Sequence, residues 1–361
     1  MILTIVVFLL VIGVLILVHE FGHFIMAKKV GVKVEEFAIG FPPRLFSKKK
    51  GETEYSINAI PLGGYVKMLG ELEHSKDKRA FENQTPGKRF SIAVAGVVMN
   101  LILAWVILTI GFAAGMSPIV SSPDAIPGKK LSSEIIFADV SPNSSAEKAG
   151  ILSGDVAISA TSSGELVEFS SLDQFDKYNS DHKNQVVKYQ IKRDGNTIEK
   201  EAALSDDSDS QLGVAIIEKA VIRVPWYKAP YVALHETYEI VKLTFEFFGS
   251  FVSKLFSTGT VEEGVGGPVA IYVYTGMAVK AGAMVLLQFV ALLSINLAVI
   301  NILPFPALDG GRLVFILLEK IFKKRVVKEK VENTIHLVGY ALLILLIVAI
   351  TYRDIANLFH K

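Results

Sequence analysis

Two histidines and a glutamate lie close together near the end of the first apolar run: His19, Glu20 and His23. In a helix, residues four apart lie on one face, about 6 Å apart along the axis, so both imidazoles can bind one metal ion. Neutral imidazole nitrogens suit zinc, and Glu20 can serve as a general base for a water that the metal acidifies. The spacing therefore predicts a zinc site with hydrolytic chemistry.

The same pattern also occurs by chance in long chains, where the histidines are ordinary helix residues. Here it falls at the end of residues 1–27, a segment apolar enough to span a membrane. A charged side chain at the centre of such a helix costs about 3 kcal/mol on insertion scales, so it seldom persists without a partner or a task. The membrane setting therefore favours the metal site.

A catalytic zinc ion needs a third protein ligand and one open position. Asp309 is the best placed candidate, because it follows the third apolar segment at the depth expected for His19 and His23. Pro304 prevents a regular helix just before it, and the two glycines after it allow tight backbone geometry. Asp309 could instead be an N-cap of the following helix. The other histidines lie outside the membrane, at a terminus or at the start of the fourth apolar segment: His74, His182, His235, His360 and His336.

The composition is that of a membrane protein. Of 361 residues, 51% are hydrophobic and 20% are charged, whereas soluble domains are closer to a quarter charged. The 37 basic and 36 acidic residues leave a net charge of +1, so we expect no nucleic acid among the partners. The absence of cysteine excludes disulfides, thiolate zinc sites, iron–sulfur clusters and thiol catalysis.

Four apolar segments are long enough to cross a bilayer, which takes about 20 residues. The first has neither a basic segment before it nor a small-residue cleavage site after it, so we expect it to be retained rather than removed as a signal peptide. The spans are predicted at residues 1–27, 91–116 and 333–352 and within residues 283–311, where the third helix runs from 283 to 303 and a Leu-Asp-Gly-Gly motif follows. The predicted fold class is therefore an α-helical polytopic membrane protein with four transmembrane helices.

Basic residues beside the spans predict the orientation, because short cytoplasmic segments are enriched in lysine and arginine. Residues 28–89 hold 13 Lys and Arg against 8 Asp and Glu, and residues 311–330 hold 7 against 2. Residues 116–282 hold 15 against 22. We therefore expect segments 28–90 and 312–332 to be cytoplasmic, and the long acidic segment and both termini to lie outside.

The long outer segment is predicted to hold a small α+β domain followed by amphipathic helices. Residues 117–222 contain short strand-like runs and a hairpin signal at Asp194 and Gly195. Residues 223–282 mix aromatic and apolar residues with charges, which suits helices at the membrane interface, with Trp226 and Tyr227 at the level of the headgroups.

The chain as a whole resembles the site-2 protease family of intramembrane zinc metalloproteases, in particular its RseP-type branch. The resemblance covers nearly the whole chain. It rests on the His-Glu-x-x-His motif, on residues 301–311 and on a single inserted PDZ-like domain within 117–222. It implies that Glu20 is the catalytic base and that Zn²⁺ has three protein ligands, His19, His23 and Asp309.

The resemblance also implies a substrate-binding surface. Residues 61–68 resemble a cytoplasmic-side, membrane-associated β-hairpin loop whose edge strand would pair with an unwound substrate, although the segment could be an ordinary hairpin. In the second span, Gly96-x-x-x-Asn100 resembles a family motif, although small residues there also serve helix packing. The implied substrate-binding residues are Gly63, Gly64, Tyr65, Asn301 and Pro304.

The implied function is hydrolysis of peptide bonds inside the membrane, in regulated intramembrane proteolysis. The substrates would be single-span membrane proteins, such as anti-sigma factors or signal-peptide remnants, that another protease has trimmed first. The PDZ-like domain would exclude bulky ectodomains or dock a newly exposed C-terminus. The protein would lie in the bacterial cytoplasmic (inner) membrane, in contact with lipid and with the PDZ-like domain outside.

Two alternatives from other classes remain open. A membrane receptor or scaffold could bind peptides through its PDZ domain and hold a metal without turnover, although such a site needs no base between its histidines. A metal transporter could use the same ligands, although the chain lacks the series of intramembrane ligands that a transport pathway requires.

Overall fold

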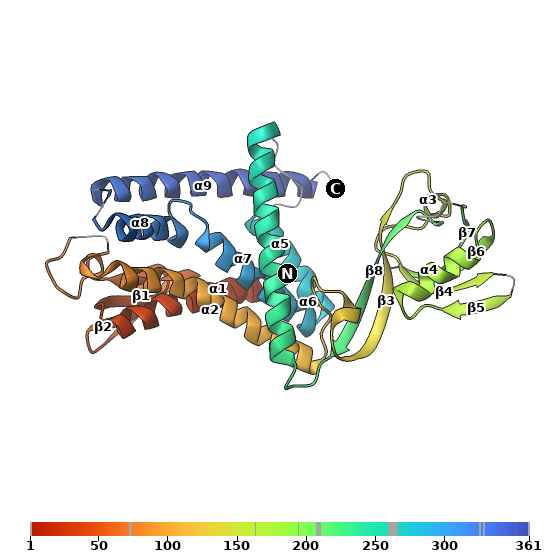
Figure 1. Ribbon diagram of the computed structural model, residues 1–361, viewed down its shortest axis with the longest axis horizontal. Coiled ribbons are helices and arrows are strands. Elements are labelled where there is room, and N and C mark those ends of the chain that lie inside the picture. The colour runs from red at the N-terminus through yellow and green to blue at the C-terminus, as the bar shows by residue number, and fades with distance from the viewer. Residues whose placement is uncertain are drawn as a thin grey trace. The chain divides into compact units, whose positions relative to one another are not determined.

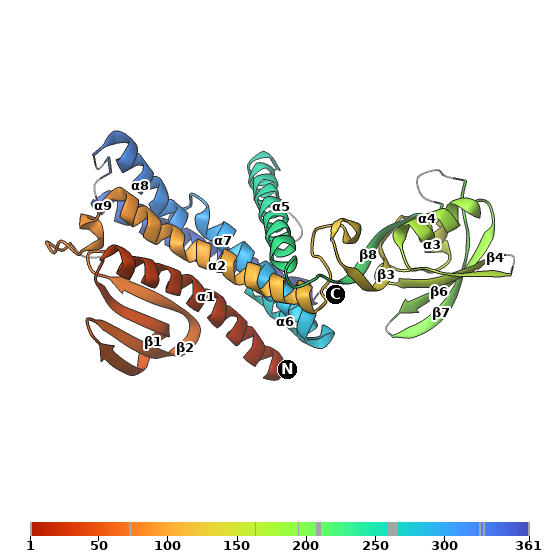
Figure 2. The same ribbon diagram turned by 60° about the horizontal axis from the view of Figure 1, so that its bottom comes forward.

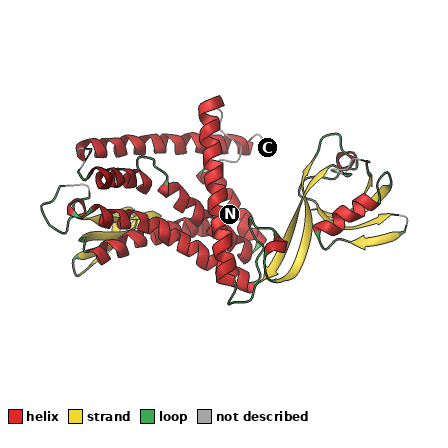
Figure 3. Ribbon diagram, in the orientation of Figure 1, coloured by secondary structure: helices red, strands yellow, loops and turns green. Residues whose placement is uncertain are grey.

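The computed structural model divides the chain into two compact units (Figure 1). One unit comprises residues 1–108 and 233–361, and the other comprises residues 109–232. Strands occur in both units, as the colouring of Figure 3 shows. The structure describes residues 2–71, 74–162, 164–193, 195–206, 211–258, 266–324, 326–327 and 329–359.

Four of the described helices are long and apolar enough to cross a membrane, which confirms the predicted fold class at that level. They are α1 (Ile2–Val30), α2 (Pro86–Ala114), α7 (Ala283–Ile302) and α9 (Glu329–Phe359), the last being apolar over Thr334–Ala356. Helix α7 ends at Ile302, one residue before Leu303, the predicted end of the third span. Proline cannot continue a helix, and Pro304 and Pro306 follow at once.

Three further helices belong to the polytopic part of the chain: α5 (Ala229–Thr258), α6 (Pro268–Ala281) and α8 (Asp309–Phe322). A short 3-10 helix, η1 (Phe81–Asn83), precedes α2. Helix α8 covers much of the segment that the sequence indicated only as basic and cytoplasmic. It buries one face through Gly310, Gly311, Leu313 and Ile316, and this face packs the start of α8 into the protein.

Strands β1 (Val34–Lys50) and β2 (Thr53–Met68) form a bent antiparallel sheet. Residues 36–39 pair with both 54–57 and 64–67, Val34 pairs with Met68, and 44–50 pair with 53–58. Among the residues that the structure describes, 64–68 have a neighbouring strand on one side only, so they form an edge. Figure 2 shows the sheet alongside α1, where Phe24 packs on Phe37 and Tyr55 with ring centroids 5.0 and 6.0 Å apart.

The second unit is an α+β domain built on a six-stranded sheet. The strand order is β7-β6-β4-β3-β8, with β5 paired to β4, and α4 packs Phe175 against Phe137 and Tyr189. The predicted hairpin is β6–β7, but its turn residue Asp194 lies outside the described residues. The elements are η2 (Pro123–Ala125), β3 (Lys129–Val140), α3 (Ser145–Lys148), β4 (Val156–Ser162), β5 (Glu165–Glu168), α4 (Leu172–Asp181), β6 (Val186–Arg193), β7 (Asn196–Ala203) and β8 (Val214–Arg223).

A partly buried ion pair ties the start of β4 to the end of β6. Arg193 Nη2 and Nε donate to Asp155 Oδ2 and Oδ1 at 2.6 and 2.7 Å, and the Leu152 amide donates to Oδ2 at 2.8 Å. Burial alone would raise the pKa of Asp155, but the hydrogen bonds from Arg193 and Leu152 outweigh it and hold the pKa below its ordinary value. A carboxylate whose pKa is lower in the folded state stabilises the fold above its unfolded pKa.

We therefore expect this domain to lose stability as the pH falls below about 4, the unfolded pKa of aspartate. Asp155→Asn should cost roughly 2 kcal/mol at neutral pH, the scale of a hydrogen bond to a charged group, and should flatten the acid dependence. Hydrogen exchange of the β4 and β6 amides in the intact protein measures both effects. Glu201→Gln, in an exposed pair with Lys188 at 3.4 Å, is the control and should change little. An equal acid dependence in Asp155→Asn would contradict this assignment.

Candidate metal centre

Helix α1 carries both motif histidines on its buried face. His19 and His23 are one turn apart, and both are more than nine-tenths buried. Their rings meet edge to face with centroids 4.8 Å apart, and the two Nε2 atoms are 3.2 Å apart. The helical spacing therefore points both imidazoles at one place, as the sequence predicted.

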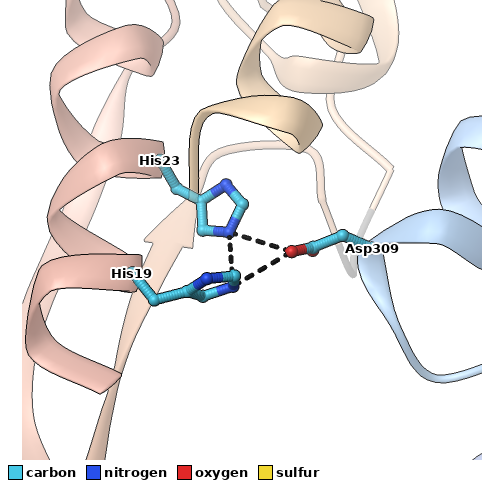
Figure 4. Close-up of side chains that lie close together, drawn as sticks. All are labelled: His19, His23 and Asp309. Carbon is cyan, nitrogen blue, oxygen red and sulfur yellow. Dashed lines mark hydrogen bonds and ion pairs between the residues drawn. The ribbon is translucent and has the colours of Figure 1, made fainter. Parts of the chain in front are cut away.

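Asp309 meets the two histidines from the first residue of α8 (Figure 4). Its Oδ2 lies 3.0 Å from His19 Nε2 and 3.3 Å from His23 Nε2. One ligand atom from each of the three residues lies within 4.8 Å of the others. The fold thus brings together the three side chains that the sequence singled out, across a separation of 290 residues.

The turn before Asp309 is compact because glycines follow it. A Cβ added to Gly311 would lie 2.5 Å from the carbonyl oxygen of Phe305, and one added to Gly310 would overlap the carbonyl oxygens of Leu303 and Ile302. Helix α8 can therefore begin directly against the chain that leads into it. This close approach explains why glycine follows Asp309 twice.

Backbone and side-chain contacts orient the imidazoles for metal binding. His23 Nδ1 lies 2.7 Å from the carbonyl oxygen of Ile92, which can only accept, so Nδ1 carries the proton and the Nε2 lone pair faces the cluster. The Asn100 amide lies 3.3 Å from His19 Nδ1, and Asn100 Oδ1 is buried with no hydrogen-bond partner among the described residues. Turned by 180°, this amide accepts a hydrogen bond from His19 Nδ1–H through its oxygen and leaves the His19 Nε2 lone pair free to bind a metal ion.

Gly96 on α2 provides the space in which the histidines converge. A Cβ at this position would lie 2.5 Å from His23 Nε2 and 2.8 Å from His19 Nε2. Two neutral imidazole nitrogens and one carboxylate, with room left beside them, are a donor set of the kind found at catalytic zinc ions. The residues present therefore fit zinc, and Gly96 and Asn100 both contribute to this fit.

The cluster opens into a cavity of about 660 Å³. Glu20 lies in its wall, as do Asn301 on α7 and the β2 edge strand through Gly64 and Tyr65. A Cβ at Gly64 would lie 3.8 Å from Glu20 Cγ, so the proposed base and the edge strand are neighbours. These four sequence-predicted residues therefore share one cavity with the cluster.

Two other predicted substrate-binding residues do not line the cavity themselves. Gly63 has φ +117°, which favours glycine, and a Cβ there would lie 2.9 Å from the Phe41 ring and 3.6 Å from Ile16, both of which line the cavity. Pro304 is exposed and is not among the lining residues. Its place is in the turn that leads to Asp309.

Several contacts near the cavity have no local signal in the sequence. Glu71, just after β2, forms an ion pair with Arg312 on α8, and both line the cavity. His336 on α9 also lines the cavity, although the sequence indicated this residue only as a possible metal ligand. No local pattern identifies Glu71, and the contact of His23 with Ile92 uses a backbone atom that any residue supplies.

The chain is similar in sequence to known proteases over nearly its whole length. Residues 7–346 match the profile described as "Peptidase family M50". A Clostridium perfringens protein, provisionally named a zinc metalloprotease, is 38% identical over 351 residues, covering 96% of this chain and 97% of its own. The regulator of sigma-E protease RseP of Escherichia coli is 31% identical over 459 residues, with coverages of 97% and 98%. The regulator of sigma-W protease RasP of Bacillus subtilis is 28% identical over 445 residues, with coverages of 99% and 99%.

Proposed function

The chain belongs to peptidase family M50 and is a zinc metalloprotease, and we propose that its site cleaves transmembrane segments of single-span membrane proteins. One observation carries the proposal. A motif glutamate and a cluster of two histidines and an aspartate line a single cavity, in the same unit as the four helices that could cross a membrane.

The proposed chemistry assigns one task to each residue of the cluster. His19 Nε2, His23 Nε2 and Asp309 Oδ2 hold the zinc ion, which when bound supplies the Lewis acidity for hydrolysis. The Glu20 carboxylate accepts a proton from the attacking water. It then delivers that proton to the amide nitrogen as the C–N bond breaks, and the water oxygen remains in the new carboxylate.

The substrate helix must open before a bond can be cut, because an intact helix hides its carbonyl groups. In lipid, each backbone group left unpaired costs several kcal/mol. The edge formed by residues 64–68 offers unpaired strand groups beside Glu20, and the Asn301 amide offers a donor and an acceptor in the same cavity. We propose that these groups bind the unwound segment.

Asn301→Leu should lower turnover by about 10-fold, the cost of roughly one hydrogen bond to the reacting segment, without removing zinc. The matched control is Asn296→Leu on the same helix, because Asn296 contacts Thr244 at 3.2 Å and is not among the cavity residues. Cleavage of a short single-span reporter in detergent, with zinc measured on each variant, checks both. Zinc loss in Asn301→Leu, or equal turnover in the two variants, would rule out this role.

We also propose that residues 117–222 are an extracytoplasmic PDZ-like domain that limits access to the site. The acidic excess of residues 116–282 supports the outer location, as the basic flanks 28–90 and 312–332 support a cytoplasmic one. Both termini would then lie outside a bacterial cytoplasmic membrane. Anti-sigma factors and signal-peptide remnants are the implied substrates, and size exclusion would require another protease to trim them first.

Deleting residues 120–220 tests the gating proposal. If the domain excludes bulky ectodomains, the deletion variant should cleave untrimmed substrate at a rate close to that for trimmed substrate, whereas the intact protein cleaves only the trimmed form. Trimmed substrate cleaved by both proteins is the control for folding. Cleavage that stays limited to trimmed substrate in the deletion variant would argue against size exclusion.

A further inference from the structure

Helix α9 contacts the turn that presents Asp309 at two neighbouring positions. His336 Nδ1 accepts a hydrogen bond from the Ala307 amide at 3.1 Å. About one helical turn later, Gly339 lies so close to Pro306 that an added Cβ would be 2.6 Å from its carbonyl oxygen and 2.7 Å from its carbonyl carbon. Pro306 and Ala307 immediately precede Leu308 and Asp309, so both contacts act just before the proposed ligand.

The turn is strained, and one of its backbone amides forms its hydrogen bond outside the turn. Ala307 has φ +80°, in the left-handed region that is unfavourable for a residue with a side chain. Within the turn, the Phe305 amide donates to the Leu303 carbonyl at 2.7 Å and the Leu308 amide donates to the Phe305 carbonyl at 3.2 Å. The Ala307 amide instead donates to the His336 side chain, on helix α9.

The hydrogen bond from the Ala307 amide determines which nitrogen of the His336 ring is protonated and how the ring is oriented. An amide N–H can only donate, so His336 Nδ1 must present a lone pair, and the proton of the neutral ring lies on Nε2. The Phe315 ring of α8 packs edge-on against His336 with centroids 5.7 Å apart. The imidazole is therefore held between the helix that starts at Asp309 and the turn before it.

Helix α9 is anchored at its far end as well. Asp354 Oδ2 accepts hydrogen bonds from the Gly267 and Ala270 amides at the start of α6, at 2.9 and 3.1 Å. Much of the apolar surface between the two ends is exposed, for example at Leu345 and Val348. Specific contacts at the two ends therefore fix the position of α9 relative to the turn.

We propose that His336 is a positioning residue for the metal site. By accepting a hydrogen bond from the Ala307 amide, it holds the strained turn 304–309 and thereby keeps Asp309 Oδ2 against His19 and His23. Gly339 serves the same end by letting α9 approach Pro306. This inference rests on the proposed zinc site and assigns the fourth candidate span a part in building it.

Replacing His336 by asparagine or by glutamine separates the roles of the two nitrogens of its ring. Asparagine at position 336 can place its oxygen where Nδ1 lies, whereas glutamine places its polar group nearer the position of Nε2. We expect His336→Leu and His336→Gln to bind zinc about 10-fold more weakly, the scale seen for supporting contacts at metal sites, and His336→Asn to stay within about 3-fold of the wild type. Competition with a zinc-binding dye in detergent measures the affinity, and kcat and KM on a trimmed reporter accompany it.

Glycine variants provide a second, independent test. Gly339→Ala should weaken zinc binding in the same direction, because its Cβ would push α9 away from Pro306. Gly249→Ala on α5 is the matched control, since nothing lies within 4 Å of a Cβ added there, and it should leave zinc affinity unchanged. Should His336→Leu not fold, the comparison of asparagine with glutamine decides.

Several outcomes would overturn the proposal. They are wild-type zinc affinity in His336→Leu, wild-type affinity in Gly339→Ala, and rescue by glutamine but not by asparagine, which would assign the role to Nε2. A wild-type protein that neither binds zinc nor cleaves the reporter would instead contradict the proposed function itself. The two failures are therefore distinguishable.

Discussion

Replacing Glu20 by glutamine should lower cleavage of a trimmed single-span reporter by about 10²–10⁴-fold, the usual contribution of a general base. Glutamine has nearly the same shape as glutamate, but its amide cannot accept the proton of the attacking water. Glu20 lines the cavity beside the cluster without being one of the three proposed ligands, so the variant should retain about as much zinc as the wild type. Single-turnover rates in detergent, with zinc measured by mass spectrometry, provide the comparison.

A matched control separates this effect from loss of charge in general. Glu246→Gln on α5 removes an exposed carboxylate whose pairing with Lys242 spans 4.0 Å, and it should cleave at the wild-type rate. If Glu20→Gln cleaved normally, the base would have to lie elsewhere. If it lost its zinc, Glu20 would be a residue of the binding site rather than the proton carrier.

Asp309→Asn should weaken zinc binding by more than about 100-fold, beyond the range seen for residues that only support ligands, and cleavage should be lost with the metal. Asp309 contributes the single negative charge of the cluster, and its Oδ2 contacts both histidines. In the wild type, a chelator should abolish cleavage and added zinc should restore it. In the variant, restoration should require a far higher zinc concentration.

The control for this prediction is Asp173→Asn, in the first turn of α4 in the other unit. It should leave zinc affinity and cleavage unchanged. Wild-type zinc affinity in Asp309→Asn would show that Asp309 is not a ligand, and the cavity would then need another third donor.

The parts of the site that the sequence predicts are those with a local cause. His19 and His23 share a helix face because of helical spacing, and the apolar runs mark the helices that could span a membrane. Asp309 is far from both histidines in the sequence. It could be predicted as the third metal ligand only because few acidic or histidine residues lie at the same expected depth in the membrane. Within a soluble fold, the same aspartate would have been one candidate among 36 acidic residues.

The parts that the sequence could not predict depend on packing between distant elements. The bend that makes residues 64–68 an edge arises from a register in which 36–39 pair on both sides, and this pairing joins segments that no local pattern links. The sequence did not predict helix α8, which covers much of the basic segment, because the buried face of this helix is short and begins with two glycines. The contact between His336 and Ala307 exists only once α9 packs on the turn.

The most direct test of the central claim is to locate the cleaved bond. A trimmed single-span reporter is incubated with zinc-loaded protein in water enriched in ¹⁸O, and the new termini are identified by mass spectrometry. We predict one new C-terminus inside the apolar segment, carrying one ¹⁸O atom, formed by the wild type and not by Glu20→Gln. No cleavage within the apolar segment by zinc-loaded wild-type protein, or the same cleavage by Glu20→Gln, would contradict the account.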